Sequence, residues 1–411
     1  MSGVGRDLSQ IRLPSRWRVV AGSDVVPWLL ADGDGEVVEP LRRFLTDFVA
    51  RGNRPGSVRS YAYGLLRWWR WLAAVEVEWD RATPDETRDY VLWLQRATKP
   101  RRSPRTVSAA RAGTTNAITG KEYLDDRYRP RTTRHGLAVV RAFYEYWAEL
   151  GLGPVVNPVQ LVGRGRAHAH HNPLEPFRSG GRIRYNPKVP KRRPRSLSDK
   201  QWSAVFGALG CHRDRALLAL TVSNGARAAE VLGMRGVDLD WGNQLVRVHR
   251  KGTQAEQWLP ASSEAFVWLR LYLAEVGPAA PDEPLWRTVR RRNRGAGAMH
   301  QPLSYDAVRA VFRRVNTRLG TNWTMHDLRH TAALRMSRDA SLSIRDVQTI
   351  LGHRHLDTTV GVYLIEDDVE VARRVLEHLA EQERCATERR PPTPVATGYD
   401  DEDLRVLLGR G

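Results

Sequence analysis

The most informative stretch of the sequence is His326-Asp327-Leu328-Arg329-His330-Thr331. A helix places His326 and Arg329, three residues apart, on one face. Histidine moves protons near neutral pH, and the arginine fork binds the non-bridging oxygens of a phosphate. The stretch therefore predicts a helix that presents a proton carrier and a fixed cation side by side.

Two motifs follow this stretch. In Leu351-Gly352-His353 the glycine predicts the end of a helix over 344–351, because glycine readily takes the positive φ of a helix C-terminus. Next, Asp357-Thr358-Thr359 predicts the N-cap of a short helix that bears Tyr363. A tyrosine hydroxyl can act as a covalent nucleophile. Taken alone, Tyr363 fits an amphipathic core position equally well.

Two more motifs lie upstream. Asn224-Gly225-Ala226-Arg227 predicts the start of a helix with Glu230 one turn further on, and Arg250-Lys251-Gly252-Thr253 predicts a turn between two short strands. Only six of the 65 basic residues are lysines, which makes Lys251 informative. Lysine can release a proton as a general acid must, whereas arginine stays charged. The alternative for Lys251 alone is a cation that touches a nucleic-acid backbone.

Composition limits the class of protein. The 411 residues carry a formal net charge of +19, and 41% of them are hydrophobic, without a continuous apolar stretch long enough for a membrane span. The N-terminus lacks a signal-peptide core, and Cys211 and Cys385 alone cannot build a disulfide framework or a zinc knuckle. We expect a soluble, cytoplasmic, nucleoid-associated protein with an anionic partner. The arginine excess also fits the codon composition of the source genome.

Changes in pattern divide the chain into five segments. We expect a leader or arm over 1–37, a helical domain over 38–160, a basic linker over 161–195, a mixed α+β domain over 196–385 and a flexible tail over 386–411. The fold class is mainly α with a small antiparallel sheet in the second domain. Helix starts are expected at Ser57, at the capping box from Thr83 to Glu86, near Thr133 and at the capping box from Ser198 to Gln201.

The linker is the most basic segment. One positive segment between two lobes suits the wrapping of a DNA duplex, although a solvated tether has the same composition. The linker residues expected to touch DNA are Arg182, Arg184, Lys188, Lys191, Arg192, Arg193 and Arg195. His168, His170 and His171 in this segment are interpreted as solvated polar residues rather than as metal ligands.

Six elements occur in the order that is typical of one enzyme family: Arg227 with Glu230, Lys251 on a strand turn, His326, Arg329-His330-Thr331, Leu351-Gly352-His353 and Tyr363. The chain therefore resembles the tyrosine recombinases, also called the phage integrase family, over 196–383, and more weakly their helical core-binding domain over 38–160. Two details depart from the family pattern. The turn begins with Arg250 where the family often has glycine, and His353 and Tyr363 are ten residues apart.

The resemblance implies a role for each catalytic residue. Tyr363 attacks a scissile phosphate, forms a 3′-phosphotyrosyl link and releases a 5′-hydroxyl. Arg227 and Arg329 bind the phosphate oxygens, and Lys251 protonates the leaving oxygen. His326 assists proton transfer at the tyrosine.

Three further residues complete the implied site. His353 hydrogen-bonds the phosphate, Glu230 supports the active-site arginine, and His330 is supporting or structural. Because the covalent link keeps the bond energy, the resemblance implies neither ATP nor a metal nor another cofactor. The implied function is site-specific recombination that moves or integrates a mobile genetic element.

The implied partner is double-stranded DNA, bound by a homotetramer on two sites, with a monomer or dimer as the free form. The segment Val369–Glu383 is amphipathic, so we expect it to pack either on a neighbouring subunit or on its own domain. The target sequence, the origin of the element and the need for an accessory factor stay open.

Three alternatives come from other classes. His326 and His330 match the two-histidine helix of zinc proteases, with His353 as a third ligand. Asp327 is short for the expected base, and Arg329 would place a permanent cation beside the metal, so this reading is disfavoured. A non-catalytic DNA-binding accessory protein and a type IB topoisomerase also fit the fold. The topoisomerase shares the chemistry but relaxes supercoils without joining partners.

Overall fold

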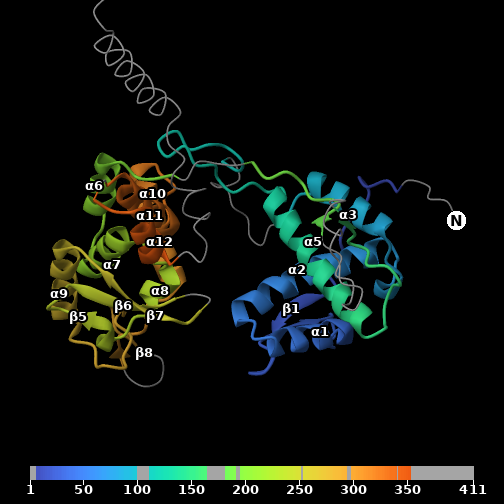
Figure 1. Cartoon of the computed structure of the whole chain (residues 1–411), viewed down its shortest axis with the longest axis horizontal. Coiled ribbons are helices and arrows are strands. Elements are labelled where there is room, and N and C mark those ends of the chain that lie inside the picture. Colours follow the sequence, from blue (N-terminus) through green and yellow to red (C-terminus); the bar gives the residue numbers. More distant parts are fainter. Residues whose placement is uncertain are drawn as a thin grey trace, which may run out of the picture. The chain divides into compact units, whose positions relative to one another are not determined.

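The computed structural model describes residues 6–99, 111–163, 181–190, 195–250, 253–293, 298–339 and 341–352. The chain divides into two compact units, Met1–Arg192 and Arg193–Gly411. Each unit has its own hydrophobic core and is described by itself (Figure 1). The division falls inside the predicted basic linker, while the exact domain bounds stay predictions.

Unit 1 is helical with two small antiparallel hairpins. Its elements are β1 (Arg18–Ala21), β2 (Trp28–Ala31), α1 (Glu39–Ala50), α2 (Pro55–Ala74), the 3₁₀ turn η1 (Trp79–Arg81), α3 (Pro84–Arg96), α5 (Pro130–Glu149), β3 (Leu161–Val162) and β4 (Arg182–Ile183).

Aromatic side chains dominate the core of unit 1. Trp68, Trp71 and Tyr90 are fully buried between α2 and α3. The polar atoms of two of the buried rings are satisfied, because Trp68 Nε1 donates to Tyr144 Oη at 3.0 Å and that hydroxyl donates to the Trp79 carbonyl at 2.8 Å. These bonds tie α2, η1 and α5 together around large, buried aromatic rings.

The N-terminal segment is part of this unit, contrary to our expectation of a leader or arm. Strands β1 and β2 pair in antiparallel register from Arg18↔Ala31 to Ala21↔Trp28. Leu30 is buried, and Trp17 packs partly buried against the same core. A strand of four residues has too few alternating positions to be recognised in the sequence.

Helix starts agree with the sequence where a side chain makes the cap. The capping box at Thr83 is present and opens α3. The expected cap at Ser57 was wrong, because α2 begins at Pro55 with Arg54 as its N-cap residue. Similarly α5 begins at Pro130, three residues before Thr133. In both cases proline occupies the first helical position, where its missing N–H has no cost.

Part of the predicted linker belongs to unit 1. Strand β4 pairs with β3 through Leu161↔Ile183 and Val162↔Arg182. Arg184 Nη1 donates to Gln160 Oε1 at 3.1 Å, and Arg134 donates to Asn186. The extended conformation agrees with the expectation, but residues 181–186 are anchored to the unit rather than solvated along their whole length.

Unit 2 is mixed. Its elements are α6 (Asp199–Gly207), α7 (His212–Asn224), α8 (Ala228–Leu232), the 3₁₀ turn η2 (Gly236–Asp238), β5 (Leu239–Asp240), β6 (Leu245–His249), β7 (Glu256–Pro260), α9 (Ser263–Val276), β8 (Arg292–Asn293), β9 (Ala298–Met299), α10 (Tyr305–Leu319), α11 (Met325–Arg338) and α12 (Ile344–Leu351).

Helix α7 forms the centre of unit 2. It packs against both α9 and α11, and its buried positions run almost all the way round the helix. Such a helix is typical of a domain interior. Its position lets the loop that follows Asn224 lie beside α11, which places the first candidate arginine near the second.

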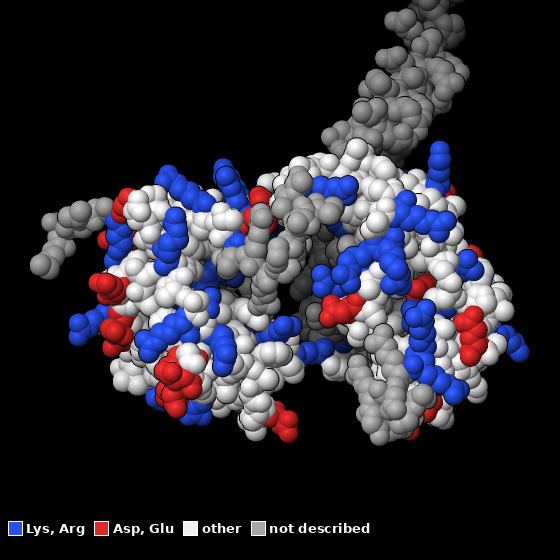
Figure 2. All heavy atoms as spheres, turned by 180° about the vertical axis from the view of Figure 1, so that it is seen from behind, with Lys and Arg blue, Asp and Glu red and all other residues white. Residues whose placement is uncertain are grey.

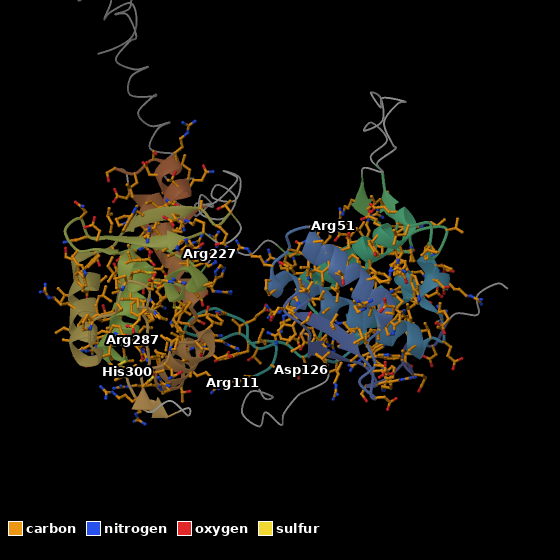
Figure 3. The ribbon with its side chains drawn as sticks, turned by 90° about the horizontal axis from the view of Figure 1, so that it is seen from below. Arg51, Arg111, Asp126, Arg227, Arg287 and His300 are labelled. Atoms are coloured by element: carbon orange, nitrogen blue, oxygen red, sulfur yellow. The ribbon has the colours of Figure 1, made fainter. Side chains whose placement is uncertain are left out.

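The sheet of unit 2 has three strands in the order β5-β6-β7. The two expected strands are present, with Val246 opposite Leu259 in antiparallel register, while β5 was not predicted. The class is therefore mainly α with small antiparallel sheets, as expected. A separate hairpin, β8–β9, is held near its base by hydrogen bonds from Arg287 N to Tyr272 Oη (2.7 Å) and between His300 Nδ1 and the Thr288 carbonyl (2.6 Å; Figure 3).

No helix in the described parts of the chain combines the length and the apolar character needed to cross a bilayer.

Candidate active site

The first candidate arginine lies at a sharp turn between two helices. Helix α7 ends at Asn224, and Gly225 takes a left-handed φ of +67°. Asn224 fixes the turn, because its Oδ1 accepts from Ala226 N (3.0 Å) and its Nδ2 donates to the Pro260 carbonyl (3.1 Å). The chain then enters α8 with Arg227 as the N-cap residue (Figure 3).

Glu230 joins two guanidinium groups. Its carboxylate accepts from Arg227 N (2.9 Å) and Arg227 Nη1 (2.8 Å), and from Arg250 Nη1 (3.1 Å). The side chain of Glu230 is 1% exposed and that of Arg227 is 31% exposed. A buried carboxylate needs such partners to offset its lost hydration. The structure therefore brings together the predicted pair Arg227 and Glu230, and leaves Arg227 partly open to solvent.

The second candidate arginine comes from α11. Arg329 is 4% exposed. Its Nη1 donates to the Gly225 carbonyl at 2.5 Å, and its Nη2 donates to the Leu351 carbonyl at 2.8 Å. Because Gly225 lies two residues before Arg227, these bonds hold Arg329 beside the turn that carries the first arginine. The two predicted arginines, about 100 residues apart in sequence, thus converge in the structure.

The C-terminal end of α12 lies where the arginines meet. A helix leaves its last carbonyls without helical partners and carries a partial negative charge at that end. Here four consecutive carbonyls accept from side chains: Thr349 from Gln257 Nε2 (3.0 Å), Ile350 from Arg250 Nη2 (2.5 Å), Leu351 from Arg329 Nη2 (2.8 Å) and Gly352 from Arg227 Nη2 (3.5 Å). As predicted, Gly352 ends the helix with a positive φ of +61°.

Arg250 is a residue of this cluster that the sequence analysis did not assign. It follows β6, is 5% exposed, and directly precedes Lys251 in the chain. Burial lowers the pKa of its guanidinium and the Glu230 carboxylate opposes this shift, while the group stays charged at neutral pH. The only sequence signal was an arginine at the start of the strand turn, and that signal does not reveal burial.

The two histidines of α11, His326 and His330, pack against each other. Their ring centroids are 4.2 Å apart in an edge-to-face arrangement. Burial lowers the pKa of His330 to about 4, and the positive charges of His326, Arg329 and Arg195 contribute in the same direction. His330 is therefore neutral at pH 7, which suits the supporting role expected for it better than a cationic one.

Asp327 and Thr331 have structural roles at this helix. The Asp327 carboxylate accepts from Thr324 N (2.9 Å) and Thr324 Oγ1 (2.7 Å), which closes the capping box of α11. Thr331 Oγ1 accepts from Leu197 N at 2.9 Å and so ties the start of the unit to α11. The zinc-protease alternative requires Asp327 as a base, whereas here this carboxylate caps the helix.

Several predicted site residues lie outside the described part of the chain. These are Lys251, His353, Tyr363 and the linker residues Lys191, Arg192 and Arg193, together with the segment Val369–Glu383. Of the remaining linker residues, Arg182, Arg184 and Lys188 are exposed, and Arg195 is half-buried near His330.

Two family models match the chain. The Phage integrase family model covers residues 198–369, and the model of the Phage integrase N-terminal SAM-like domain covers residues 41–119. The first match includes every predicted catalytic residue, and the second falls within unit 1.

Curated relatives have corresponding names. Transposase A from transposon Tn554 of Staphylococcus aureus is 25% identical over 371 residues, which are 87% of this chain and 95% of that protein. Tyrosine recombinase XerC of Azotobacter vinelandii is 31% identical over 261 residues, which are 61% of this chain and 75% of that protein.

Solved structures agree in fold. The integrase of transposon Tn1549 in complex with circular intermediate DNA has a TM-score of 0.51 at 15% identity, covering 82% of this chain and 98% of that one. A lambda integrase dimer bound to a core site has a TM-score of 0.51 at 14% identity, covering 79% and 93%. Taken with the family models and the relatives, the convergence of Arg227, Glu230 and Arg329 places this chain in the phage integrase family, the tyrosine recombinases.

Proposed function

We propose that this protein is a site-specific DNA recombinase that cleaves and rejoins duplex DNA through a 3′-phosphotyrosyl intermediate. The observation that carries the proposal is the meeting of Arg227 and Arg329 at the end of α12. Two guanidinium groups in one place suit the two non-bridging oxygens of a phosphodiester. In the sequence, His353 directly follows Gly352, the C-cap residue of α12, and Tyr363 comes ten residues after His353.

The proposed chemistry balances without an outside energy source. The Tyr363 oxygen forms a bond to phosphorus, and the bond from phosphorus to the 5′ oxygen breaks. Lys251 donates the proton that the leaving 5′ oxygen takes up, while His326 accepts the proton of the tyrosine. A 5′-hydroxyl from the partner duplex then attacks the phosphotyrosine and reverses the steps.

The remaining residues hold this arrangement. Glu230 orients Arg227 through the 2.8 Å ion pair, and His353 donates to the phosphate. Arg329 is held by the carbonyls of Gly225 and Leu351, so its planar group has a defined orientation before DNA binds. Such preorganisation is the main way in which a protein stabilises charge that develops during a reaction.

Double-stranded DNA is the proposed partner, and exchange between two duplexes requires four cleavages, one from each subunit of a tetramer. Basic and acidic side chains are interspersed on the visible faces of both units (Figure 2). The proposal rests on the arginine cluster at the end of α12 rather than on this view. Transposase and recombinase relatives favour partner exchange over supercoil relaxation or accessory binding.

The test uses covalent capture from a pool of nicked duplexes with a randomised central sequence. A nick near the cleavage point lets a short fragment diffuse away, so the phosphotyrosyl protein accumulates. We expect the wild-type protein to retain a subset of duplexes through denaturing washes, and Tyr363→Phe to bind those duplexes with unchanged affinity and to retain none.

Tyr305→Phe is the matched control, because Tyr305 is 51% exposed at the start of α10, a helix that carries no candidate residue. Undiminished covalent capture by Tyr363→Phe removes that tyrosine from the mechanism. Relaxed plasmid topoisomers without joined products, formed on the selected sequence, would instead favour the topoisomerase reading.

A further inference from the structure

We propose that Arg250 is a positioning residue that fixes the end of α12, up to Gly352, against Glu230 and Arg227. The inference rests on the proposed function for its activity readout and on contacts within unit 2 for its geometry.

Arg250 connects three elements through one guanidinium. Its Nη1 donates to Glu230 Oε2 in α8 (3.1 Å), its Nε donates to Gln257 Oε1 in β7 (2.8 Å), and its Nη2 donates to the Ile350 carbonyl in α12 (2.5 Å). The three bonds leave in different directions from a rigid planar group. Helix α12 therefore cannot shift relative to the sheet or to α8 without breaking at least one of them.

The contact with α12 is close as well as polar. A Cβ atom added to Gly352 would lie 2.8 Å from Arg250 Nε and 2.9 Å from Arg250 Cζ. The guanidinium thus lies directly over the residue that ends the helix. Gly352 immediately precedes His353 in the sequence, so Arg250 contacts the last described residue before the predicted catalytic segment.

Glu230 is shared between Arg250 and Arg227. Oε1 faces Arg227 Nη1, whereas Oε2 accepts from Arg227 N and Arg250 Nη1. Removing Arg250 takes away the Arg250 Nη1 donor, one of the bonds that fix the orientation of this carboxylate. Arg250 thus acts on the orientation of Arg227, the more exposed arginine, through the Glu230 carboxylate, although Arg250 itself is almost fully buried.

Burial of this cation is costly in itself. The Arg250 side chain is 6% exposed, and a buried ion pair seldom exceeds a well-packed apolar pair in stability. The presence of a buried arginine here is therefore better explained by the geometry that it fixes at the end of α12 than by a contribution to stability. Gln257 reinforces the connection, because its Nε2 donates to the Thr349 carbonyl at 3.0 Å.

The test compares Arg250→Gln, Arg250→Lys and the control Arg247→Gln on the duplexes selected above. Arg247 lies on β6, the strand that Arg250 follows, and pairs with Asp238 (2.8 Å) and Glu256 (3.2 Å), away from α12. We expect Arg250→Gln to bind the duplex within about twofold of wild type and to form the covalent adduct roughly 10- to 100-fold more slowly, as a misplacement of about 1 Å allows. Arg250→Lys should recover part of the rate.

Hydrogen exchange supplies a readout that needs no DNA. Peptides that cover residues 344–352 should exchange faster in Arg250→Gln than in wild type, and no faster in Arg247→Gln. If Arg250→Gln does not fold, Gln257→Ala removes one of the same connections and should show both effects more weakly. Wild-type rates of adduct formation and of exchange in Arg250→Gln overturn the inference, as does a loss of adduct that merely follows a loss of DNA binding. No adduct with wild-type protein overturns the proposed function instead, and exchange still decides the role of Arg250.

Discussion

Arg227 and Arg329 differ in exposure although both are expected to bind the phosphate. The Arg227 side chain is 31% exposed, whereas Arg329 is 4% exposed and donates to two main-chain carbonyls. Solvent reaches Arg227 in the structure as it stands. We therefore expect Arg227 to meet the DNA first, while Arg329 keeps the orientation that the two carbonyls give it.

His330 predicts a pH dependence of stability. Its pKa is about 4 in the folded chain, below the value of about 6.5 expected when unfolded. As pH falls from 6.5 towards 4 the unfolded chain takes up a proton that the folded chain does not, so stability falls. Between pH 7 and 4.5 wild type should lose about 2 kcal/mol more than His330→Asn, after allowance for partial exposure of the ring. Urea unfolding at both pH values measures this difference.

The control for this prediction is His249→Asn, at the exposed end of β6. Its unfolding free energy should change with pH as that of wild type does. If the unfolding free energy of His330→Asn changes with pH as much as that of wild type, His330 takes up its proton in the folded chain as readily as in the unfolded chain. That result would contradict a buried histidine that stays neutral.

Individual residues show what the sequence could reveal. Arg227, Glu230 and Arg329 were predicted because order and spacing are visible in a sequence, and the structure brings them together. Arg250 was not predicted, because its importance comes from burial between α8, β7 and α12, and those contacts span up to 100 residues of chain. The roles of Lys251, His353 and Tyr363 stay predictions.

At the scale of single elements, the turn from α7 to α8 is a tightly constrained point near the site. Gly225 has a φ of +67°, and a Cβ atom there would lie 2.8 Å from Leu351 Cδ2 and 3.3 Å from Ala332 Cβ. Gly225→Ala therefore combines an unfavourable backbone conformation with crowding against α11 and α12. We expect a loss of about 2–4 kcal/mol in the unfolding free energy of unit 2, measured by chemical denaturation.

Gly151→Ala separates the two contributions. Gly151 has nearly the same φ, +68°, but no atom lies within 4 Å of the added Cβ. It should cost unit 1 only the backbone contribution, about 1–2 kcal/mol. Equal losses for the two substitutions would mean that the Leu351 contact yields easily and that the end of α12 is not tightly packed.

Elements differed in how well the sequence predicts them. Helices with a side-chain cap, such as those at Thr83 and Ser198, begin where expected, because the capping box is a local pattern. Helices that begin at Pro55 and Pro130 have no side-chain cap, and their starts were misplaced by two or three residues. The hairpin β1–β2 and strand β5 were missed because pairing with a neighbour, rather than local pattern, creates such short strands.

At the scale of the whole molecule, the anchoring of 181–186 to unit 1 changes what the linker is expected to do. Arg182 and Arg184 are exposed, and within the described residues they donate to the Asn186 carbonyl and the Gln160 side-chain oxygen, both neutral. Because no carboxylate of the described residues pairs with them, these cations are available to a phosphate. Because residues 181–186 are anchored to unit 1, these side chains also lose less conformational entropy on binding than they would on a solvated tether.

This arrangement predicts a change in salt dependence. Each neutralised phosphate contributes a slope of about −0.9 to the plot of log affinity against log salt. If both arginines contact the DNA backbone, Arg182→Gln combined with Arg184→Gln should reduce the slope by about 2, equally on selected and on unrelated duplexes, because phosphate contacts do not depend on sequence.

The control combines Arg42→Gln with Arg88→Gln, two exposed arginines whose charge is already paired with Glu39 (2.7 Å) and Asp85 (2.8 Å). The slope of the control should stay near that of wild type, because arginines that are already paired with carboxylates neutralise few phosphates and so release few counterions from the DNA. A linker variant with an unchanged slope would place the DNA path elsewhere on the two units and leave β4 as a purely structural strand.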